Sequence, residues 1–350
     1  MGERITFRRN EGLITVKPYW RGNPVVKGRF VNRQHRSKQG VGNVLKWRFS
    51  PNPQRKEKRN ENWEPQLFPL HSLQGISGDA LAWLGHNSFF MQLGGKRIMF
   101  DPVFGNIPFV RRKSKFPADP DIFKEIDYLL ISHDHFDHMD KPSITRLYEN
   151  NPRMKVFCGL GMKDLIRGWL PDIQVIEAGW YQRWEEGRLK ITFLPAQHWS
   201  KRSLNDGGLR LWGAFMLQTD DLSVYYGGDT GYSSHFTEIE ELFGAPDYAL
   251  LGIGAYKPRW FMQANHISPY DSLTAASQMK ARITIPMHYG TFDLSDEPLS
   301  RRGRQKEYTG KDSGFRGNCK ASEKMIYKFL LYENNFITYR IFYFFSYDSM

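Results

Sequence analysis

The sequence has few cysteines, no long hydrophobic run and no apolar leader at its start. Its 350 residues include two cysteines, Cys158 and Cys319, too few for a disulfide framework, which favours a reduced, cytoplasmic chain. No run of eighteen apolar residues occurs, so we expect no helix that spans a membrane. The first six residues, MGERIT, lack the apolar core of a signal peptide. These absences argue against a disulfide-stapled secreted domain and against an integral membrane protein.

Basic residues outnumber acidic residues at both ends of the chain. Residues 1–60 carry 16 Lys and Arg against 3 Asp and Glu, and residues 301–350 carry 10 against 5. Such basic ends suit an anionic membrane surface, and solvated arms without a partner are the alternative. The Pro-, Lys- and Arg-rich stretch 48–59 is interpreted as a loop or flexible linker. It resembles no nucleic-acid module, so we expect no nucleic-acid partner.

The middle of the chain has the pattern of a mixed domain of strands and helices. Between residues 81 and 100, short apolar runs are separated by turn signals such as Gly94-Gly95, which predicts a meander of strands. Beyond residue 140, strand patterns alternate with helix patterns, as in 142–150 followed by 155–158. We therefore expect mixed sheets with helices on their outer faces.

Three of the ten histidines in the chain fall within six residues, in the run His133-Asp134-His135-Phe136-Asp137-His138. His133 and His135 lie two residues apart and project to the same side of an extended backbone. The Asp-His pair that ends the run can turn toward a second point. Because imidazole nitrogen and carboxylate oxygen are ligands of zinc, the run predicts two adjacent metal sites. A polar loop that happens to be rich in histidine is the alternative.

Three more candidate ligands each follow a predicted strand. They are His198, Asp229 and His288. Taken singly, a histidine after a strand is more often structural, and an aspartate after Gly-Gly is more often a turn residue. Together with the His133–His138 run they form an ordered set, and that order is specific.

The ordered set resembles the metallo-β-lactamase superfamily. The five motifs of that superfamily are Asp, H-x-H-x-D-H, His, Asp and His, and they correspond here to Asp101, His133–His138, His198, Asp229 and His288. The resemblance implies an α+β fold, a four-layered αββα sandwich with a dinuclear metal site at the sheet edge. It also implies a division into a basic N-terminal extension partly packed on the core (1–60), a hydrolase domain (61–300) and a divergent C-terminal tail (301–350).

A more specific resemblance, to the N-acyl-phosphatidylethanolamine-hydrolysing phospholipase D family, lies outside the ligands. It covers roughly residues 80–298, with a short patch near residue 30. The runs that carry it are WLGH at 83–86, QHWSKR at 197–202, GDTGY at 228–232, GAYKPRWFM at 254–262 and HYGTF at 288–292. The run at 254–262 is far more specific than the shared metal motif.

This resemblance implies two Zn²⁺ per chain, with iron or manganese as alternatives. One zinc would be held by His133, His135 and His198, and the other by Asp137, His138 and His288. Asp229 would bridge both metals. The implied reaction is phospholipase D-type hydrolysis of N-acyl-phosphatidylethanolamine or a related phospholipid by a metal-bridging hydroxide.

The same resemblance suggests roles for residues around the metals. Asp137 would orient the attacking water or accept its proton, and His266 would be a second catalytic or phosphate-facing group, with a structural role at a helix start as the alternative. Asp101 is interpreted as a support for the ligand loop. His86 and Trp83 are interpreted as structural. Arg259 either neutralises a phosphate or forms a surface ion pair.

Two departures from the family pattern stand out. Phe136 occupies a position where mammalian members of the family carry tyrosine, so a hydroxyl that could contact the phosphate is missing. After residue 299 the resemblance stops, and the unrelated tail that follows contains the aromatic run 339–345. If this tail folds, we expect a strand or a segment that touches a membrane.

Other functions remain open at this point. A sugar-phosphate lactonase-like hydrolase on the same fold is the main alternative, and a non-catalytic membrane-peripheral binder is another. A β-lactamase is disfavoured because no secretion signal precedes the domain. For the leading interpretation we expect a phospholipid substrate, a cytoplasmic protein peripheral to an anionic membrane, and either a monomer or a dimer.

Overall fold

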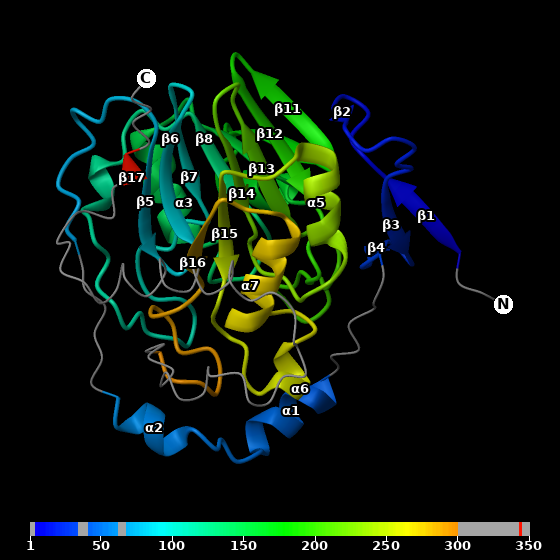
Figure 1. Ribbon diagram of the computed structural model, residues 1–350, viewed down its shortest axis with the longest axis vertical. Helices are drawn as coiled ribbons and strands as arrows, with labels where there is room; N and C mark the ends of the chain where they lie inside the picture. Colours follow the sequence, from blue (N-terminus) through cyan, green and yellow to red (C-terminus); the bar gives the residue numbers. More distant parts are fainter. Residues whose placement is uncertain (1–3, 34–40, 62–67, 300–342, 345–350) are drawn as a thin grey trace.

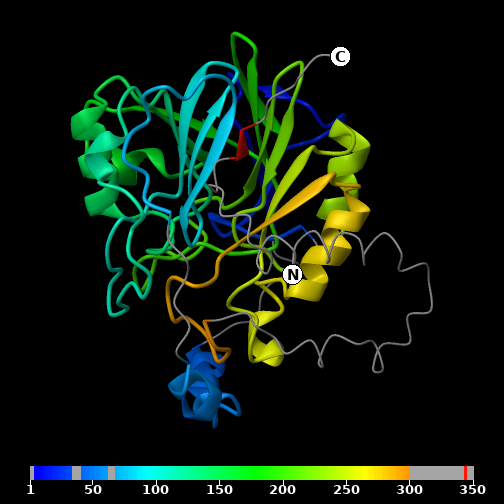
Figure 2. The same cartoon turned by 60° about the vertical axis from the view of Figure 1, so that its left-hand side comes forward.

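Two seven-stranded sheets lie face to face and carry helices on their outer sides (Figures 1 and 2). The computed structural model describes residues 4–33, 41–61, 68–299 and 343–344. Figure 2 shows the sheets nearly edge-on between the two groups of helices. The expected four-layered αββα sandwich is therefore confirmed.

The first sheet is built from a meander followed by parallel strands. Its order is β10-β9-β8-β7-β6-β5-β17. Pairing is antiparallel from β5 to β7 and parallel from β7 to β10. The strands are β5 (Ala80–Gly85), β6 (Ser88–Leu93), β7 (Lys96–Phe100), β8 (Tyr128–Ile131), β9 (Lys155–Gly159), β10 (Gln174–Ala178) and β17 (Tyr343–Phe344).

The second sheet repeats this plan and adds an N-terminal strand at its edge. Its order is β16-β15-β14-β13-β12-β11-β2, antiparallel from β2 to β14 and parallel from β14 to β16. The strands are β2 (Ile14–Thr15), β11 (Gln182–Glu186), β12 (Leu189–Leu194), β13 (Ala214–Gln218), β14 (Ser223–Tyr226), β15 (Tyr248–Gly252) and β16 (Ile283–Met287).

Alternating side chains of each strand divide the core into layers. In β8, Tyr128 and Leu130 belong to the cluster between the sheets, whereas Leu129 and Ile131 pack toward the helices outside the first sheet. A strand with two buried faces reads as a continuous apolar run, because neither set of side chains meets water. This explains why β8, Tyr128–Ile131, has no polar alternation.

Helices cover both sheets, and capping side chains fix the starts of the two ten-residue helices. α3 (Lys141–Asn150) begins at Asp140, which accepts a hydrogen bond from the Ser143 amide, and α4 (Lys163–Arg167) lies on the same side. On the second sheet lie α5 (His235–Phe243) and α7 (Pro269–Gln278), the latter with a capping box at Ser268. The short helices α6 (Arg259–Met262) and η1 (Pro120–Ile122) lie in loops.

The N-terminal segment forms its own small structure and reaches the main sheets. β1 (Ile5–Arg8), β3 (Asn23–Val26) and β4 (Arg29–Phe30) form a three-stranded sheet, and β2 pairs with β11. Two helices follow, α1 (Val41–Phe49) and α2 (Arg55–Arg59). The interpretation of 48–59 as a loop is therefore wrong in part, because Pro51 and Pro53 interrupt helix without preventing α2 from forming after them.

Two further expectations concern membrane-spanning helices and the C-terminal tail. Within the residues described here, no helix has the length and apolar character needed to cross a membrane. Most of the tail from residue 300 lies outside the described residues, but β17 pairs with β5 through Tyr343 opposite Leu81. That short pairing agrees with the expectation of a strand in the aromatic run.

Candidate metal centre

All candidate ligands converge at one edge of the sandwich, just beyond the ends of strands. His133 follows β8, His198 follows β12, Asp229 follows β14, and His288 follows β16. The first comes from one sheet and the other three from the opposite sheet. The set predicted from sequence is thus brought together from segments more than 150 residues apart.

One cluster consists of His133, His135 and His198. His133 Nε2 lies 2.9 Å from His135 Nδ1, and His198 Nε2 lies 3.2 Å from the same Nδ1 atom. Two nitrogens on a tetrahedral zinc with bonds of about 2.0 Å would lie roughly 3.3 Å apart. The three rings are therefore spaced as ligands of a common ion are.

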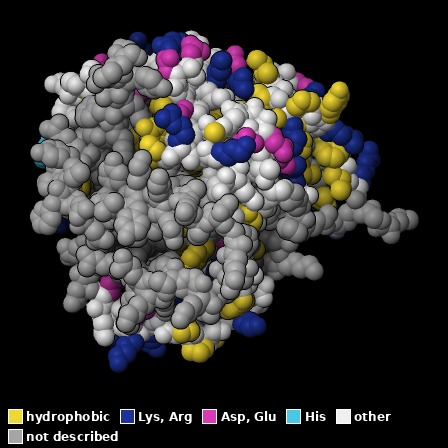
Figure 3. Space-filling view, in the orientation of Figure 1, with side chains coloured by type: hydrophobic (Ala, Val, Ile, Leu, Met, Phe, Trp, Pro, Cys, Tyr) yellow, Lys and Arg dark blue, Asp and Glu magenta, His cyan; other side chains and the backbone are white. Residues whose placement is uncertain are grey.

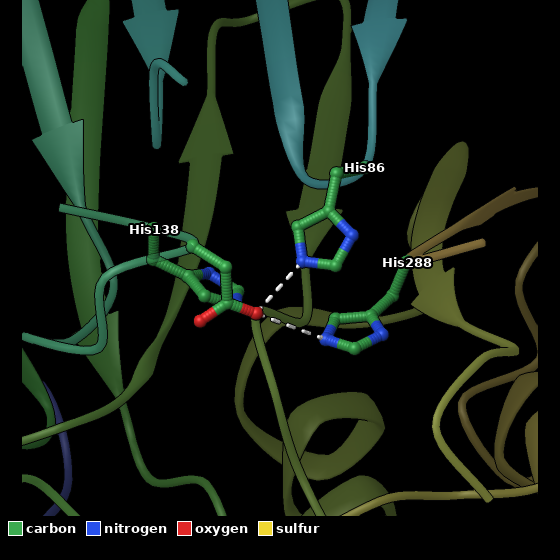
Figure 4. A group of neighbouring side chains, drawn as sticks. His86, His138 and His288 are labelled. Carbon is green, nitrogen blue, oxygen red and sulfur yellow. Dashed lines mark hydrogen bonds and ion pairs between the residues drawn. The ribbon is translucent and has the colours of Figure 1, made fainter. Parts of the chain in front are cut away.

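A second cluster brings Asp137 and His138 together with His288 and His86. Figure 4 shows the three labelled histidines, His86, His138 and His288, gathered around one carboxylate. Asp137 Oδ2 lies 2.9 Å from His86 Nε2, 3.6 Å from His138 Nε2 and 3.8 Å from His288 Nε2. These groups can hold a second ion.

Asp229 lies between the two clusters. Its Oδ2 atom is 3.1 Å from His288 Nε2 and 3.2 Å from His138 Nε2 on one side. On the other side it is 3.8 Å from His198 Nε2 and 3.9 Å from His133 Nε2. A carboxylate in this position can offset the repulsion between two cations, as the sequence interpretation of a bridging residue requires.

The donor atoms fit a metal better than they fit one another. The Nε2 atoms of His138 and His288 are buried, and although each lies close to Asp229 Oδ2, neither has a partner in hydrogen-bond geometry among the described residues. Leaving a buried polar atom unpaired costs about 1–3 kcal/mol, so such atoms call for a partner. Divalent cations satisfy unpaired imidazole nitrogens directly, and the set of nitrogen and carboxylate donors is the kind that zinc takes.

The pKa values of the buried side chains also favour the binding of cations. Burial, with neighbouring His138, lowers the pKa of His133 well below its ordinary value, so the ring is neutral near pH 7. Burial opposes ionisation of Asp229, but attraction to His138 and His288 lowers its pKa well below the usual range. Burial likewise opposes a charge on His138, but Asp229 and Asp137 raise its pKa. His138 therefore carries a proton near pH 7, and metal binding to its ring would displace that proton.

A layer of buried side chains supports the ligands from behind. Asp101 accepts hydrogen bonds from the Ser132 amide at 2.8 Å and from the Tyr226 hydroxyl at 2.8 Å, and its Oδ2 lies 2.8 Å from His138 Nδ1. This is the supporting role that the sequence analysis assigns to Asp101. Asp101 and His288 both have positive φ, at 36° and 63°, so the ends of β7 and β16 are strained where they meet the centre.

The turn between β5 and β6 contributes two residues that sequence reasoning missed. His86 is interpreted from sequence as structural, yet its ring centroid lies 4.1 Å from that of His288, and burial with His288 lowers its pKa to about 3. Asn87 has its amide nitrogen 3.1 Å from Asp229 Oδ1. Trp83 has the structural role expected, because its Nε1 donates to the His86 carbonyl at 2.8 Å. The only sequence signal was two polar residues directly after a buried strand.

His266 lies at the outer side of the centre. Its Nδ1 atom is 3.7 Å from Asp229 Oδ2, and 18% of its side chain is exposed. Burial lowers its pKa to about 4, so the ring is neutral at pH 7. His266 therefore belongs to the cluster spatially and also lies before α7.

The segment 254–262 packs directly against the centre. A Cβ atom on Gly254 would lie 1.7 Å from the His288 carbonyl oxygen, so only glycine permits this approach. Arg259 pairs with Asp271 on α7 at 2.8 Å. Its charge is thus used in a partly exposed ion pair, the second of the two roles considered from sequence.

Phe136 lies at the rim of the centre, 38% exposed. The guanidinium carbon of Arg202 lies 4.1 Å from the centroid of its ring and 5.3 Å from that of Trp169. Arg202 also donates to the Asp134 and Met139 carbonyls, both at 2.7 Å. The phenylalanine thus holds a cation–π contact with an arginine that ties the ligand loop to the 198–210 segment.

Comparison with known proteins agrees with this geometry. The beta-lactamase superfamily domain matches residues 96–289. An N-acyl-phosphatidylethanolamine-hydrolyzing phospholipase D of Caenorhabditis elegans is 32% identical over 69% of this chain and 74% of its own length. A mitochondrial phospholipase D of the same name from Saccharomyces cerevisiae is 31% identical over 69% of this chain and 54% of its own.

A solved structure resembles the fold. The isothiocyanate hydrolase from Delia radicum gut bacteria superposes with a TM-score of 0.52 at 16% identity, covering 63% of this chain and 88% of that one. At this identity the likeness concerns the fold alone.

Proposed function

The chain belongs to the metallo-β-lactamase superfamily and, within it, to the relatives of N-acyl-phosphatidylethanolamine-hydrolysing phospholipase D; it is a metal-dependent hydrolase, and we propose that it cleaves a phosphodiester of a phospholipid. The substrate class proposed is N-acyl-phosphatidylethanolamine or a close analogue. The observation that carries the proposal is that all seven residues implied as metal ligands lie in one cluster, in a chain 32% identical to such an enzyme.

We propose that the centre holds two Zn²⁺ ions on the two clusters described above. His133, His135 and His198 would hold one ion, Asp137, His138 and His288 the other, and Asp229 would lie between them. When bound, the ions would supply Lewis acidity toward the phosphate and lower the pKa of a water to near neutrality.

Residues of the chain would accept the proton of the water, orient the carboxylate that accepts it, and contact the phosphate. Asp137 has the more exposed carboxylate, 14% accessible against 3% for Asp229, so it can reach an incoming water and accept its proton at Oδ1. Its Oδ2 atom is held by His86 Nε2 at 2.9 Å, which fixes the orientation of the carboxylate. His266, neutral and on the open side, can donate a ring N–H to a phosphate oxygen.

A substrate comparison tests this proposal. Purified protein loaded with zinc is given N-acyl-phosphatidylethanolamine, bis-p-nitrophenyl phosphate and a lactone, and the products are measured by mass spectrometry. We expect hydrolysis of both phosphodiesters, with phosphatidic acid released from the lipid and little lactone turnover. Absence of phosphodiester turnover while both ions are bound would contradict the proposal, and lactone turnover alone would favour the lactonase-like alternative.

We further propose that α1 and α2 meet an anionic lipid surface. Trp47 anchors α1, since its Nε1 donates to Asp296 at 3.1 Å and its ring stacks on Phe261 at 5.1 Å. The helix leaves Leu45 and Phe49 50% and 83% exposed. Figure 3 shows hydrophobic and basic side chains next to each other along the lower edge, where Figure 1 places these helices. An apolar and basic surface of this kind suits the interface of a membrane.

The position of this surface agrees with a lipid substrate. Phe261 belongs to the 254–262 segment, whose Gly254 touches the backbone of His288. The basic residues of the surface are exposed at Lys46, Arg48, Arg55, Lys56 and Arg59. A membrane held by α1 would therefore lie on the side of the molecule that carries the metal centre.

Neutralising two basic residues tests the membrane proposal. Lys46→Gln with Arg48→Gln should weaken binding to phosphatidylserine vesicles by about 1 kcal/mol per residue, roughly 30-fold for the pair. Cosedimentation measures this at low and high salt. The matched control is Lys124→Gln with Arg153→Gln, two exposed residues before β8 and β9, at the opposite end of the sheet. Wild-type binding that ignores anionic lipid and salt would contradict the proposal.

A further inference from the structure

Asn87 lies behind the metal centre, in the turn between β5 and β6, and is fully buried. Its side-chain amide donates to Asp229 Oδ1 at 3.1 Å, and the same nitrogen is 3.4 Å from His138 Nδ1. Its backbone carbonyl oxygen lies 2.8 Å from the Tyr226 hydroxyl, whose single hydrogen is shared between this oxygen and Asp101 Oδ2. The turn is therefore held in place by β14 while its side chain reaches the carboxylate.

The two oxygens of Asp229 have different surroundings. Oδ1 is engaged by Asn87, whereas Oδ2 lies 3.1–3.9 Å from the Nε2 atoms of His133, His138, His198 and His288. Without a donor at Oδ1, the carboxylate could turn about the Cβ–Cγ bond so that each of its oxygens faces a different cluster. With the donor in place, Oδ2 alone faces both clusters.

Within the described part of the chain, the side-chain amide of Asn87 has one unsatisfied end, as do those of the buried residues Asn23 and Asn265. The Oδ1 atom of Asn87 is buried and has no hydrogen-bond partner among the described residues. Asn151, another buried asparagine, accepts from the Ile126 amide and donates to the Phe123 and Leu147 carbonyls, so both ends of its amide are satisfied. Buried amides normally satisfy both ends, as Asn151 does. The side chain of Asn87 makes its hydrogen bonds only with the centre.

We propose that Asn87 is a positioning residue for Asp229, which holds the carboxylate so that Oδ2 faces both clusters of proposed ligands. This inference rests on the dinuclear centre proposed above. Loss of the amide would free the carboxylate to rotate, and the second metal would be held less tightly. Partners of metal ligands typically affect metal affinity by about 10–100-fold, and we expect a change of that size for the weaker of the two sites.

The test uses the full chain loaded with Mn²⁺, because two Mn²⁺ ions that share a bridging atom give an exchange-coupled electron paramagnetic resonance signal. Asn87→Ala removes the amide and leaves a cavity, whereas Asn87→Leu removes it at similar volume. Both variants should show about 10–100-fold weaker binding of the second Mn²⁺ and loss of the coupled signal. If one variant does not fold, the other carries the test. The matched control is Asn151→Ala, which removes a buried amide far from the centre and should lower the melting temperature without changing either readout.

Two results would overturn the inference. One is wild-type affinity and coupling in a folded Asn87 variant, and the other is an equal loss of affinity in Asn151→Ala. Failure of the wild-type protein to bind two Mn²⁺ ions would contradict the dinuclear centre itself, so the two failures are distinguishable.

Discussion

Removal of the bound metals with a chelator is expected to abolish hydrolysis and to lower the melting temperature by roughly 10 °C. A ligand present at a thousand times its Kd stabilises the folded state by about 4 kcal/mol, and each kcal/mol shifts the melting temperature of a domain of this class by about 2–4 °C. Without metal, burial and the nearby charge of Asp229 oppose ionisation of Asp137, but His138 and His86 outweigh them and lower its pKa overall.

Differential scanning fluorimetry and phosphodiester turnover, before chelation, after it and after zinc is returned, measure both effects. Chelator saturated with zinc beforehand serves as the control for effects of the chelator itself. A metal-free protein that keeps its melting temperature and its turnover would show that the histidine cluster is not a metal centre.

Asp229→Asn is expected to reduce turnover at least about 1000-fold while the protein remains folded. The substitution keeps the shape of the side chain but removes the negative charge that lies between the two clusters. Charge stabilisation of this kind is worth several kcal/mol, and each 1.36 kcal/mol corresponds to a tenfold change in rate. We also expect fewer metal ions per chain, measured by elemental analysis after desalting.

Asp247→Asn is the matched control for this substitution. Asp247 accepts hydrogen bonds from the amide and hydroxyl of Ser223 and pairs with Arg282, at the end of the second sheet away from the centre. It should lose some stability and keep its metals and turnover. Full activity in the Asp229 variant would refute a role between the metals.

The order of strands and helices could be predicted because the burial pattern is local. In β8 both faces are buried, and the apolar run 128–131 indicates this directly. The helix α3 begins where Asp140 and Pro142 indicate. Such signals depend on neighbours within a few residues, so they are visible in the sequence.

The candidate ligands could also be predicted, because each follows a strand and the ends of parallel strands meet at one edge. His86 and Asn87 could not, because they belong to a hairpin turn. The direction of a side chain in a turn depends on contacts that form only in the folded protein. Here these contacts are the Thr291 hydroxyl, which accepts from the His86 amide at 2.8 Å, and the Tyr226 hydroxyl on the Asn87 carbonyl.

The N-terminal helices likewise depend on contacts that form only in the folded protein. The charges and prolines in 48–59 indicate a loop, but α1 is held by Trp47 through Asp296 and Phe261, more than 200 residues away. Asn52 also donates to the Asp296 carbonyl at 2.9 Å. Tertiary contacts of this kind override weak local propensity, and a single sequence does not reveal them.

The origin of the ligands in both sheets has a mechanical consequence. The sheets face each other through apolar side chains such as Phe100 and Tyr226, whose centroids are 4.7 Å apart, and apolar contact alone has little directional preference. Coordinate bonds are directional, so an ion held by His138, from the loop after β8 in one sheet, and by His288, after β16 in the other, would limit how far one sheet can slide along its partner. A core substitution that shifts the halves by a fraction of an ångström should therefore loosen the cofactors well before the protein unfolds.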